Sequence, residues 1–234
     1  MLTLKNVLKR LLRGKYVGLS QLDRKLEKYV DYNNGYFVEL GANDGVTQSN
    51  SLYFEKYRNW RGLLVEPAPQ NYLKCRKNRS VRDSIYCAAC VSFDYGHEFV
   101  RIAYSNLMST PVSLESDIQD PRAHAQLGDR FLSNGETVFE FGAVAHTLNS
   151  LLLDAGSPKV IDFLSLDVEG AELEVLKGVD HQAFRFKYIL VECRDFPRLS
   201  SYLVSHGYRF VEPFSSQDYL FAAEGLSQSG VGGG

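Results

Sequence analysis

Acidic side chains stand at the ends of four short apolar runs, and they are the groups best suited to chemistry in this chain. These acids are Glu39, Glu66, Asp167 with Glu169, and Glu192 with Asp195. Carboxylates can bind a cationic ligand, coordinate a hard metal ion through oxygen, or accept a proton as a general base. A single acid at such a place is more often the cap of the next helix. Their repetition predicts a functional edge, because ligands of open α/β sheets bind outside the carboxyl ends of the strands.

The first of these acids opens a glycine-rich turn. The run YFVELGANDG, residues 36–45, predicts a buried strand and a tight turn with Gly41 and Gly45, and a helical pattern follows. Glu66 ends the next apolar run, twenty-one residues after Gly45. Strand, glycine turn, helix, strand and acid, in this order, are typical of the nucleoside-binding half of an α/β sheet, in which the second acid binds the ribose hydroxyls.

The spacing of the glycines and the charge of the turn indicate which nucleoside fits. A dinucleotide site requires G-x-G-x-x-G for close approach to a pyrophosphate, whereas this turn reads G-x-x-x-G and carries Glu39 and Asp44. A carboxylate about 4 Å from a phosphate costs roughly 4 kcal/mol at an effective dielectric near 20, and it gains about as much beside an ammonium group. The turn therefore favours a phosphate-free ligand with a cationic tail, such as S-adenosylmethionine. An NAD enzyme, or an acidic turn that only caps a helix, is the alternative.

The order of apolar and helical segments predicts the α/β class, with a seven-stranded, mostly parallel sheet and helices on both faces. After the two strands already described, further strands are expected at residues 84–91, 160–166, 187–191, 208–212 and 218–223. Less regular strands are expected near residues 92–104 and 137–141, and helices at residues 69–79, 147–154, 171–177 and 196–206. The turn at residues 213–217 is too short for a parallel crossover, so the last strand should be antiparallel.

Composition limits the classes of protein to which the chain can belong. With 234 residues, of which 44% are hydrophobic, the chain can bury one large core. A net charge of −2 argues against general nucleic-acid binding. We recognise no signal peptide and no run of 18 apolar residues, so the sequence predicts a cytoplasmic protein. Cys87 and Cys90 form a lone C-x-x-C pair, for which reduced thiols in a core are expected rather than metal or redox chemistry.

Three segments differ from the rest of the chain, whose main domain is expected at residues 31–224. Residues 1–30 carry eight basic and two acidic side chains, a net charge of +6. This segment should be helical, and it would either pack on the domain or rest on a membrane surface or partner. Residues 105–136 break the periodicity and are expected to form a lid-like insertion. Residues 225–234 are rich in Gly and Ser and should be disordered. The apolar face of the N-terminal helix would consist of Leu4, Val7, Leu8, Leu11 and Leu12.

The chain resembles the FkbM family of S-adenosylmethionine-dependent methyltransferases in four stretches. They read GYFVELGANDGVTQSNSLYFEK, WRGLLVEPAP, IDFLSLDVEGAELEVLKGV and YILVECR. The resemblance covers about residues 33–195 and depends most on ELGANDG and LDVEGAE in this order. It implies a Rossmann-like class I methyltransferase fold and O-methylation of a hydroxyl on a sugar, glycan or other natural product. The family commonly has Asp after the leucine before the fourth strand, where this chain has Asn149.

The resemblance also implies site residues. Glu66 would bind the ribose hydroxyls, while Asp167, Glu169 and Glu192 are the catalytic candidates at the reacting edge. The residues expected around the cofactor are Glu39, Gly41, Ala42, Asn43, Asp44, Ser49, Asn50, Glu66, Pro67, Ala89 and Asp167.

A hydroxyl acceptor must lose its proton before or during methyl transfer. A general base can take it, or a divalent cation can lower the pKa of the hydroxyl. One prediction is therefore Mg²⁺ or Mn²⁺ held by Asp167 and Glu192, with Asp195 or Glu169 completing the shell. The other is a carboxylate base without metal. The remaining base candidates are His124 and His146. Methylation of nitrogen, or nucleoside binding without catalysis, remains the alternative to O-methylation.

Overall fold

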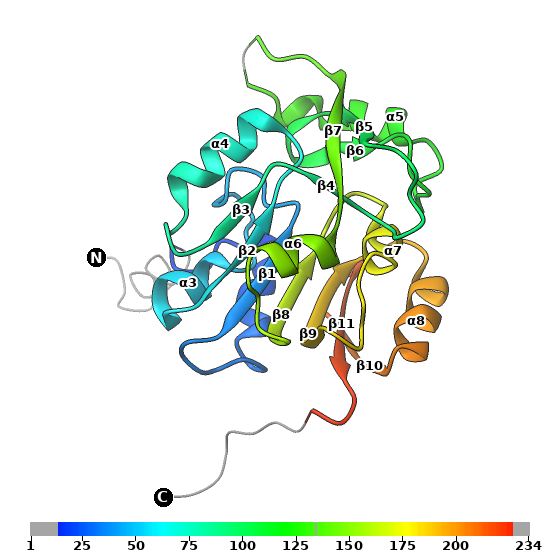
Figure 1. Ribbon diagram of the computed structural model, residues 1–234. Helices are drawn as coiled ribbons and strands as arrows, with labels where there is room; N and C mark the ends of the chain where they lie inside the picture. The colour runs from blue at the N-terminus through cyan, green and yellow to red at the C-terminus, as the bar shows by residue number, and fades with distance from the viewer. Residues whose placement is uncertain (1–13, 134, 227–234) are drawn as a thin grey trace, which may run out of the picture.

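The computed structural model describes residues 14–133 and 135–226, and its centre is a seven-stranded sheet with the order β10-β11-β9-β8-β1-β2-β3 (Figure 1). Pairing is parallel from β9 to β3, whereas β11 is antiparallel to both of its neighbours. The predicted mostly parallel sheet with an antiparallel last strand is therefore confirmed. The strands are β1 (Tyr36–Leu40), β2 (Arg61–Val65), β3 (Ser84–Tyr86), β8 (Val160–Leu166), β9 (Arg185–Glu192), β10 (Tyr208–Pro213) and β11 (Asp218–Ala223).

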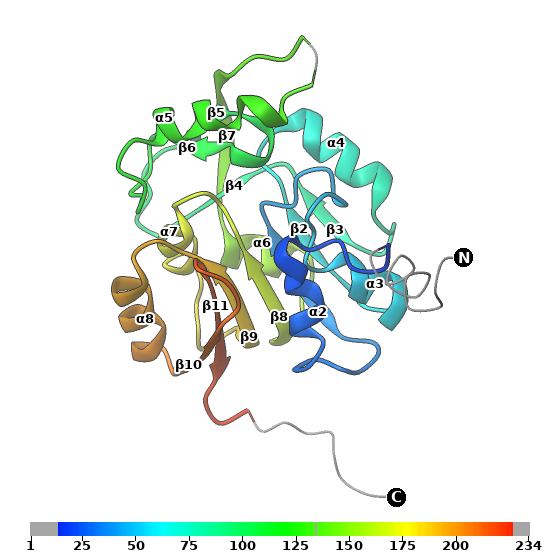
Figure 2. The same cartoon turned by 180° about the vertical axis from the view of Figure 1, so that it is seen from behind.

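Helices cover both faces of this sheet. One face packs against α6 (Leu148–Asp154), α7 (Glu172–Leu176) and α8 (Phe196–Ser205). The other packs against α2 (Leu22–Leu26), α3 (Leu52–Arg58) and α4 (Pro69–Asn78), which Figure 2 shows from behind. Strand β1 is buried along its whole length because both of its faces are covered, as expected for a parallel strand between two helical layers.

A second, four-stranded sheet corrects the predicted course of the chain. It has the order β4-β7-β5-β6 and consists of β4 (Ala89–Val91), β5 (Phe99–Tyr104), β6 (Thr110–Pro111) and β7 (Phe139–Thr147). The prediction of one strand over residues 84–91 was wrong, because the chain leaves the central sheet after β3 and pairs again, as β4, with β7. A continuous apolar run does not reveal such a break, since its periodicity is the same on both sides.

The insertion at residues 105–136 is more regular than its sequence indicates. It contains β6, the helix α5 (Pro121–Gln126) and the short 3-10 helices η2 (Asn106–Met108) and η3 (Leu127–Phe131). Asp120 caps α5 by accepting hydrogen bonds from the backbone N–H groups of Arg122 and Ala123. Figure 1 shows this layer, with α5, β5 and β6, at one end of the central sheet.

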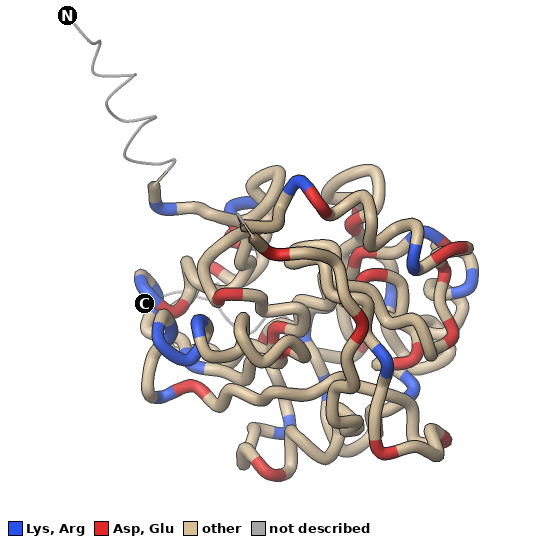
Figure 3. Tube along the Cα trace, turned by 90° about the horizontal axis from the view of Figure 1, so that it is seen from above, with Lys and Arg blue, Asp and Glu red and all other residues tan. Residues whose placement is uncertain are grey.

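The first described residues lie against the domain. Leu22, Leu26 and Val30 are buried in the same core as Phe37 of β1, so this part of the basic segment packs on the sheet. The predicted apolar face formed by Leu4, Val7, Leu8, Leu11 and Leu12 lies outside the described residues, as does most of the predicted disordered tail. Among the residues that are described, no helix has the length and apolarity needed to cross a membrane. Figure 3 shows basic and acidic residues interleaved over the described part of the chain.

Candidate active site

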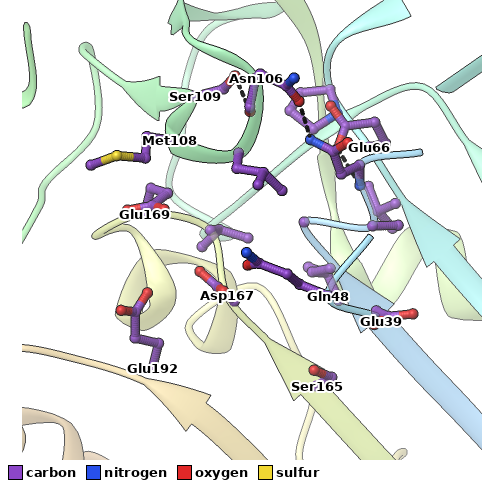
Figure 4. Close-up of a pocket in the computed structure, with 18 of the residues that line it drawn as sticks. Glu39, Gln48, Glu66, Asn106, Met108, Ser109, Ser165, Asp167, Glu169 and Glu192 are labelled. Atoms are coloured by element: carbon purple, nitrogen blue, oxygen red, sulfur yellow. Dashed lines mark hydrogen bonds between the residues drawn. The ribbon is translucent and has the colours of Figure 1, made fainter. Parts of the chain in front are cut away.

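A cavity of about 460 Å³ lies where β1, β2, β8 and β9 reach their carboxyl ends. Its walls combine the glycine turn, the ends of these strands and the insertion. Figure 4 shows Asp167, Glu169 and Glu192 on one side of the cavity, with Glu39 and Glu66 on the other. The acids that the sequence placed at the ends of separate strands therefore face one space.

The glycine turn directly touches the motif LDVEGAE, which follows β8. Gly41 has a φ of +77°, and a Cβ on it would lie 1.9 Å from the carbonyl oxygen of Asp167. No other residue fits there, because a side chain would collide with backbone and the left-handed conformation favours glycine. Gly41 thus lets the ends of β1 and β8 approach each other, and it brings the predicted cofactor turn beside the predicted catalytic acid.

Glu39 is buried and fully engaged with the protein. Its exposed fraction is 4%. One carboxylate oxygen accepts the backbone N–H of Asn50 at 2.8 Å, and the other accepts Ser49 Oγ at 2.9 Å and the hydroxyl of Ser51. Arg79 pairs with the same oxygen at 3.2 Å. Because all these partners lie in or next to the loop after the glycine turn, Glu39 fixes the shape of that loop while its side chain lines the cavity.

Glu66 has the opposite character, with few partners. One oxygen accepts the backbone N–H of Asn43 at 2.8 Å and the other that of Ala68 at 2.9 Å, so each oxygen keeps a free lone pair. Burial raises the pKa of the Glu66 carboxyl to about 7, against the opposing effect of these two hydrogen bonds. Glu66 lines the cavity, and the hydroxyls of a bound ribose would donate to its free lone pairs.

Three carboxylates cluster at the edge that the sequence predicts to be the reacting one. Asp167, Glu169 and Glu192 each offer an oxygen, and these oxygens all lie within 4.8 Å of one another. Asp167 is exposed to the cavity but enclosed by protein on its other sides. This burial, together with the charges of Glu192 and Glu169, raises the pKa of Asp167 well above its ordinary value. Burial likewise raises the pKa of Glu192. Two such close carboxyls disfavour each other's ionisation, which is the cause of the raised pKa of Asp167 beside burial.

The motif DVEGAE forms the turn after β8, and its residues position these acids. Glu172 is buried and accepts hydrogen bonds from the backbone N–H groups of Val168 at 2.9 Å and Gly170 at 3.2 Å. Glu169 lies between them in a left-handed conformation, with a φ of +55°. Such a conformation is costly for a residue with a side chain and clusters at functional sites. Here it turns the Glu169 side chain toward the cavity.

A guanidinium and an imidazole reach the acids from two directions. Arg194, which follows β9, has Nη2 at 3.4 Å from Glu169 Oε2 and 3.7 Å from Glu192 Oε1. His124, from α5 of the insertion, has Nε2 at 2.7 Å from the same oxygen of Glu169. Asp117, also from the insertion, accepts the backbone N–H of Arg194 at 2.6 Å. The insertion is thus bonded to the acidic edge.

The insertion also contacts the cofactor side of the cavity. Asn43 donates through its side-chain amide to Asn106 Oδ1 at 3.0 Å. The sequence identified this segment as a possible lid but none of its lining residues, because no periodicity marks them. Other wall residues that the sequence did not identify come from the segment around Leu19, from the loop after the glycine turn and from β8. The cavity residues missed in this way include Leu19, Gln48, Asn106, Leu107, Met108, Ser109, Pro111, Leu114, Arg130, Phe131 and Ser165.

Most predicted site residues line the cavity, but Asp44 and Asp195 do not. Asp44 accepts hydrogen bonds from the backbone N–H groups of Val46 at 2.8 Å and Thr47 at 2.7 Å, so its role is in the turn itself. Asp195 caps α8 and is absent from the group of three carboxylates, in which Glu169 takes the place suggested for it. His146 is exposed on β7, away from the cavity wall. The predicted residues that line the cavity are Glu39, Gly41, Ala42, Asn43, Ser49, Asn50, Glu66, Pro67, Ala89, Asp167, Glu169 and Glu192.

The sheet order and the cavity at the carboxyl ends of its strands define a Rossmann-like class I methyltransferase fold. Residues 39–210 match the family model described as the methyltransferase FkbM domain. Because this match covers well over half of the sequence, the chain belongs to the FkbM methyltransferase family.

Individual relatives are more distant. The chain is 28% identical over 165 residues to methyltransferase sdnD of Sordaria araneosa. This match covers 64% of this chain and 62% of that protein. The chain therefore spans about three fifths of the length of this relative. Similar solved structures include the METTL16 methyltransferase domain, with 12% identity, a TM-score of 0.46 and coverage of 86% of this chain and 65% of that chain. Another is M. capricolum TrmK in complex with S-adenosyl-homocysteine, with 13% identity, a TM-score of 0.39 and coverage of 87% and 71%.

Proposed function

We propose that this protein is an S-adenosylmethionine-dependent O-methyltransferase that acts on a hydroxyl of a sugar, a glycan or another natural product. The observation that carries the proposal is the single cavity that joins the phosphate-free glycine turn and Glu66 to the carboxylates at the end of β8. Membership of the FkbM family supports the same reaction class.

The cavity has two ends that suit the two halves of the cofactor. Glu66, Pro67 and Ala89 form the wall where the adenosine would lie, since Glu66 has lone pairs for the ribose. The sulfonium would lie toward Asp167, where negative charge stabilises a cation. A phosphate would be repelled at both ends, which is why we favour S-adenosylmethionine over NAD.

The chemistry requires alignment and removal of one proton. Alignment of acceptor oxygen, methyl carbon and sulfur can supply roughly 7–11 kcal/mol of the barrier in favourable cases. In our proposal a carboxylate of the group formed by Asp167, Glu169 and Glu192 takes the hydroxyl proton, because these oxygens lie close together at the cavity. A positioned base contributes about 10²- to 10⁴-fold to such a step.

A divalent cation is the second arrangement of the same site. Carboxylate oxygens are the ligands that Mg²⁺ prefers, and Asp167, Glu169 and Glu192 would hold it. Such an ion would supply positive charge that lowers the pKa of the acceptor hydroxyl. Arg194 already brings a positive charge to two of these acids. To decide between the two arrangements, methyl transfer is measured after exhaustive EDTA treatment and again after addition of Mg²⁺ or Mn²⁺. Full activity in EDTA would exclude the metal and favour the carboxylate base. Activity that is lost in EDTA and restored by the ion would favour the metal.

The experiment that tests the function measures transfer of a labelled methyl group from S-adenosylmethionine to a panel of sugars, glycosides, phenols and amines. Labelled ethers are the expected products. Labelled amines without ethers would favour the N-methyltransferase alternative. Calorimetric binding of S-adenosylhomocysteine with no turnover on any acceptor would favour a nucleoside-binding protein, and preferential binding of NAD would overturn the cofactor assignment. Contact of the basic N-terminal segment with a membrane surface or partner stays a separate prediction.

A further inference from the structure

A short segment that leads into α2 forms part of the cavity wall, although it precedes the family region at residues 39–210. We call residues 17–23, which include the first two residues of α2, the N-terminal strap. Gly18 of the strap forms a parallel β-bridge with Gln48, which follows the glycine turn. Leu19 and Gln48 both line the cavity. The strap is therefore joined to the loop that carries the predicted cofactor contacts.

A buried carboxylate anchors the strap. Asp23 has an exposed fraction of 0%. One of its oxygens accepts the backbone N–H groups of Val17 at 2.8 Å and Gly18 at 3.1 Å, and the other accepts that of Arg24 at 2.9 Å. A carboxylate that satisfies three backbone donors fixes the path of the chain around it. The strap is thus a defined structure rather than a loose lead into the domain.

Gly18 brings the strap close to Asn50, which lines the cavity. A Cβ at this position would lie 2.8 Å from Asn50 Oδ1 and 2.9 Å from Asp23 Oδ1. Asn50 itself is held in place, because its backbone N–H is bound to Glu39 and its side-chain amide donates to Ser165 Oγ at 3.1 Å. The close fit at Gly18 therefore transmits the position of the strap to the loop of residues 48–50.

Gln48 is the residue that this arrangement presents to the cavity. It has a left-handed backbone with a φ of +60°, and Ser20 and Gln21 of the strap are left-handed too, with φ of +50° and +59°. Conformations of this kind persist only where the surroundings impose them. Figure 4 shows the Gln48 side chain reaching into the cavity with its amide pointing toward Asp167.

The chemistry of the wall indicates what the Gln48 amide would bind. The amino-acid part of S-adenosylmethionine ends in a carboxylate, which needs hydrogen-bond donors. Among the described residues that line the cavity, the only basic one is Arg130, which belongs to the insertion. The other donors of this wall are neutral, and among them the amide of Gln48 offers two N–H groups to such a carboxylate.

We propose that the N-terminal strap holds Gln48 as a donor to the carboxylate of the cofactor's amino-acid part. This inference rests on the proposed function, since it assumes that the cavity binds S-adenosylmethionine. It assigns a positioning role to residues 17–23, which lie outside the region matched by the family model, and a binding role to Gln48, which lies inside it. Loss of the strap's position should weaken binding through Gln48, and not through the adenosine end.

The test compares two ligands and three variants by calorimetry. S-adenosylhomocysteine carries the amino-acid part, whereas 5′-methylthioadenosine lacks it. We expect Gln48→Ala and Gly18→Ala each to weaken S-adenosylhomocysteine by roughly 10-fold or more, the range for loss of a hydrogen bond to a charged group. Both should leave 5′-methylthioadenosine within about 2-fold. Gly96→Ala is the matched control, because a Cβ there meets nothing within 4 Å.

A double variant shows whether the strap acts through Gln48. If it does, Gly18→Ala adds little to Gln48→Ala; full additivity would overturn the proposed coupling. Gln48→Glu, which places a negative charge against the ligand carboxylate, should weaken binding more than Gln48→Ala and carries the test if Gly18→Ala does not fold. Unchanged S-adenosylhomocysteine affinity in the Gln48 variants would overturn the inference alone. Failure of the unaltered protein to bind either ligand would instead overturn the proposed function.

Discussion

Glu39 and Asp167 lie at the ends of two neighbouring parallel strands, β1 and β8, yet their surroundings are opposite. Glu39 accepts hydrogen bonds from two serine hydroxyls and a backbone N–H and pairs with Arg79. Asp167 opens onto the cavity, and burial together with the charges of Glu192 and Glu169 raises its pKa. The first carboxylate is surrounded by donors and a cation, whereas the second lies next to like charges. Acids with a perturbed pKa in a cavity are typical of catalytic sites, so we expect the first strand end to act on structure and the second on reaction.

The largest effect in this comparison is expected on activity from Asp167→Asn. Removing the ionisable group should lower methyl transfer by about 10²- to 10⁴-fold, the contribution of a positioned base, while S-adenosylhomocysteine affinity changes only a few-fold. Labelled-methyl assays and calorimetry measure the two quantities. Asp94→Asn, an exposed acid in a turn, is the control. Near-normal activity of Asp167→Asn would remove the contrast between the two strand ends.

The matching change at the other strand end is Arg79→Met, which should act on stability. It leaves the Glu39 carboxylate buried without its cation, and breaking a buried pair in this way costs about 3–5 kcal/mol of unfolding free energy. Urea unfolding measures the loss. Arg82→Met is the control, since Arg82 is exposed and exposed charges contribute about 1 kcal/mol or less. A loss at Arg79 no larger than at Arg82 would contradict a structural role for Glu39.

A smaller, pH-dependent effect is expected at Glu66. Burial raises the pKa of this carboxyl to about 7, so it is mostly protonated at pH 6 and mostly ionised at pH 8. Ribose hydroxyls donate best to the ionised form; S-adenosylhomocysteine should therefore bind more tightly as pH rises from 6 to 8. Glu66→Gln should flatten this dependence and cost about 1–3 kcal/mol of binding at pH 8. A pH profile that Glu66→Gln leaves unchanged would exclude Glu66 as its source.

Stability of the ligand-free protein should follow the opposite trend with pH. The folded pKa of Glu66 lies above its ordinary value of 4.5, so the unfolded chain ionises first and the contribution of Glu66 to stability falls between about pH 4.5 and pH 7. The unfolding free energy of Glu66→Gln should therefore rise relative to that of the unaltered protein as the pH increases over this range.

The smallest effect is expected where the insertion meets the acids. His124→Ala removes the contact with Glu169 at 2.7 Å, and we expect kcat to fall by roughly 3- to 10-fold, as for one hydrogen bond. The affinity for S-adenosylhomocysteine should not change. His124→Gln, which keeps a donor, should recover part of the loss, and His97→Ala, on an exposed turn, should have no effect. Equal losses in both His124 variants would point to packing rather than to the bond with Glu169.

The sequence predicted the central sheet well because its strands carry local signals. Apolar runs that end in an acid, with Gly41 and Gly45 in the turn, mark β1, β2, β8 and β9 and place four acids at one edge. The second sheet was missed because its strands pair across long separations, for example β4 with β7. Local periodicity carries no record of such pairing.

The site, like the fold, was predicted only in part from the sequence. Residues in the motifs, such as Glu66 and Asp167, line the cavity as expected. Asp44 and Asp195 were included because an acid near a strand end looks the same in sequence whether it faces a ligand or caps a turn. Gln48 and Leu19 were missed because a bridge to residue 18 positions them, and no spacing in the chain announces that contact.

The pairing of β4 with β7 holds together the two ends of a long excursion of the chain. The excursion that carries β5, β6 and α5 leaves through β4 and returns through β7, and these two strands lie side by side. Because this pairing holds the two ends together, lengthening or replacing the part between them costs little additional closure entropy. The strand pairing of the central sheet does not depend on this part of the chain. The contacts of Asn106 with Asn43 and of His124 with Glu169 do depend on it. The wall that this layer gives to the cavity can therefore change in sequence and length while the strand order of the central sheet stays the same.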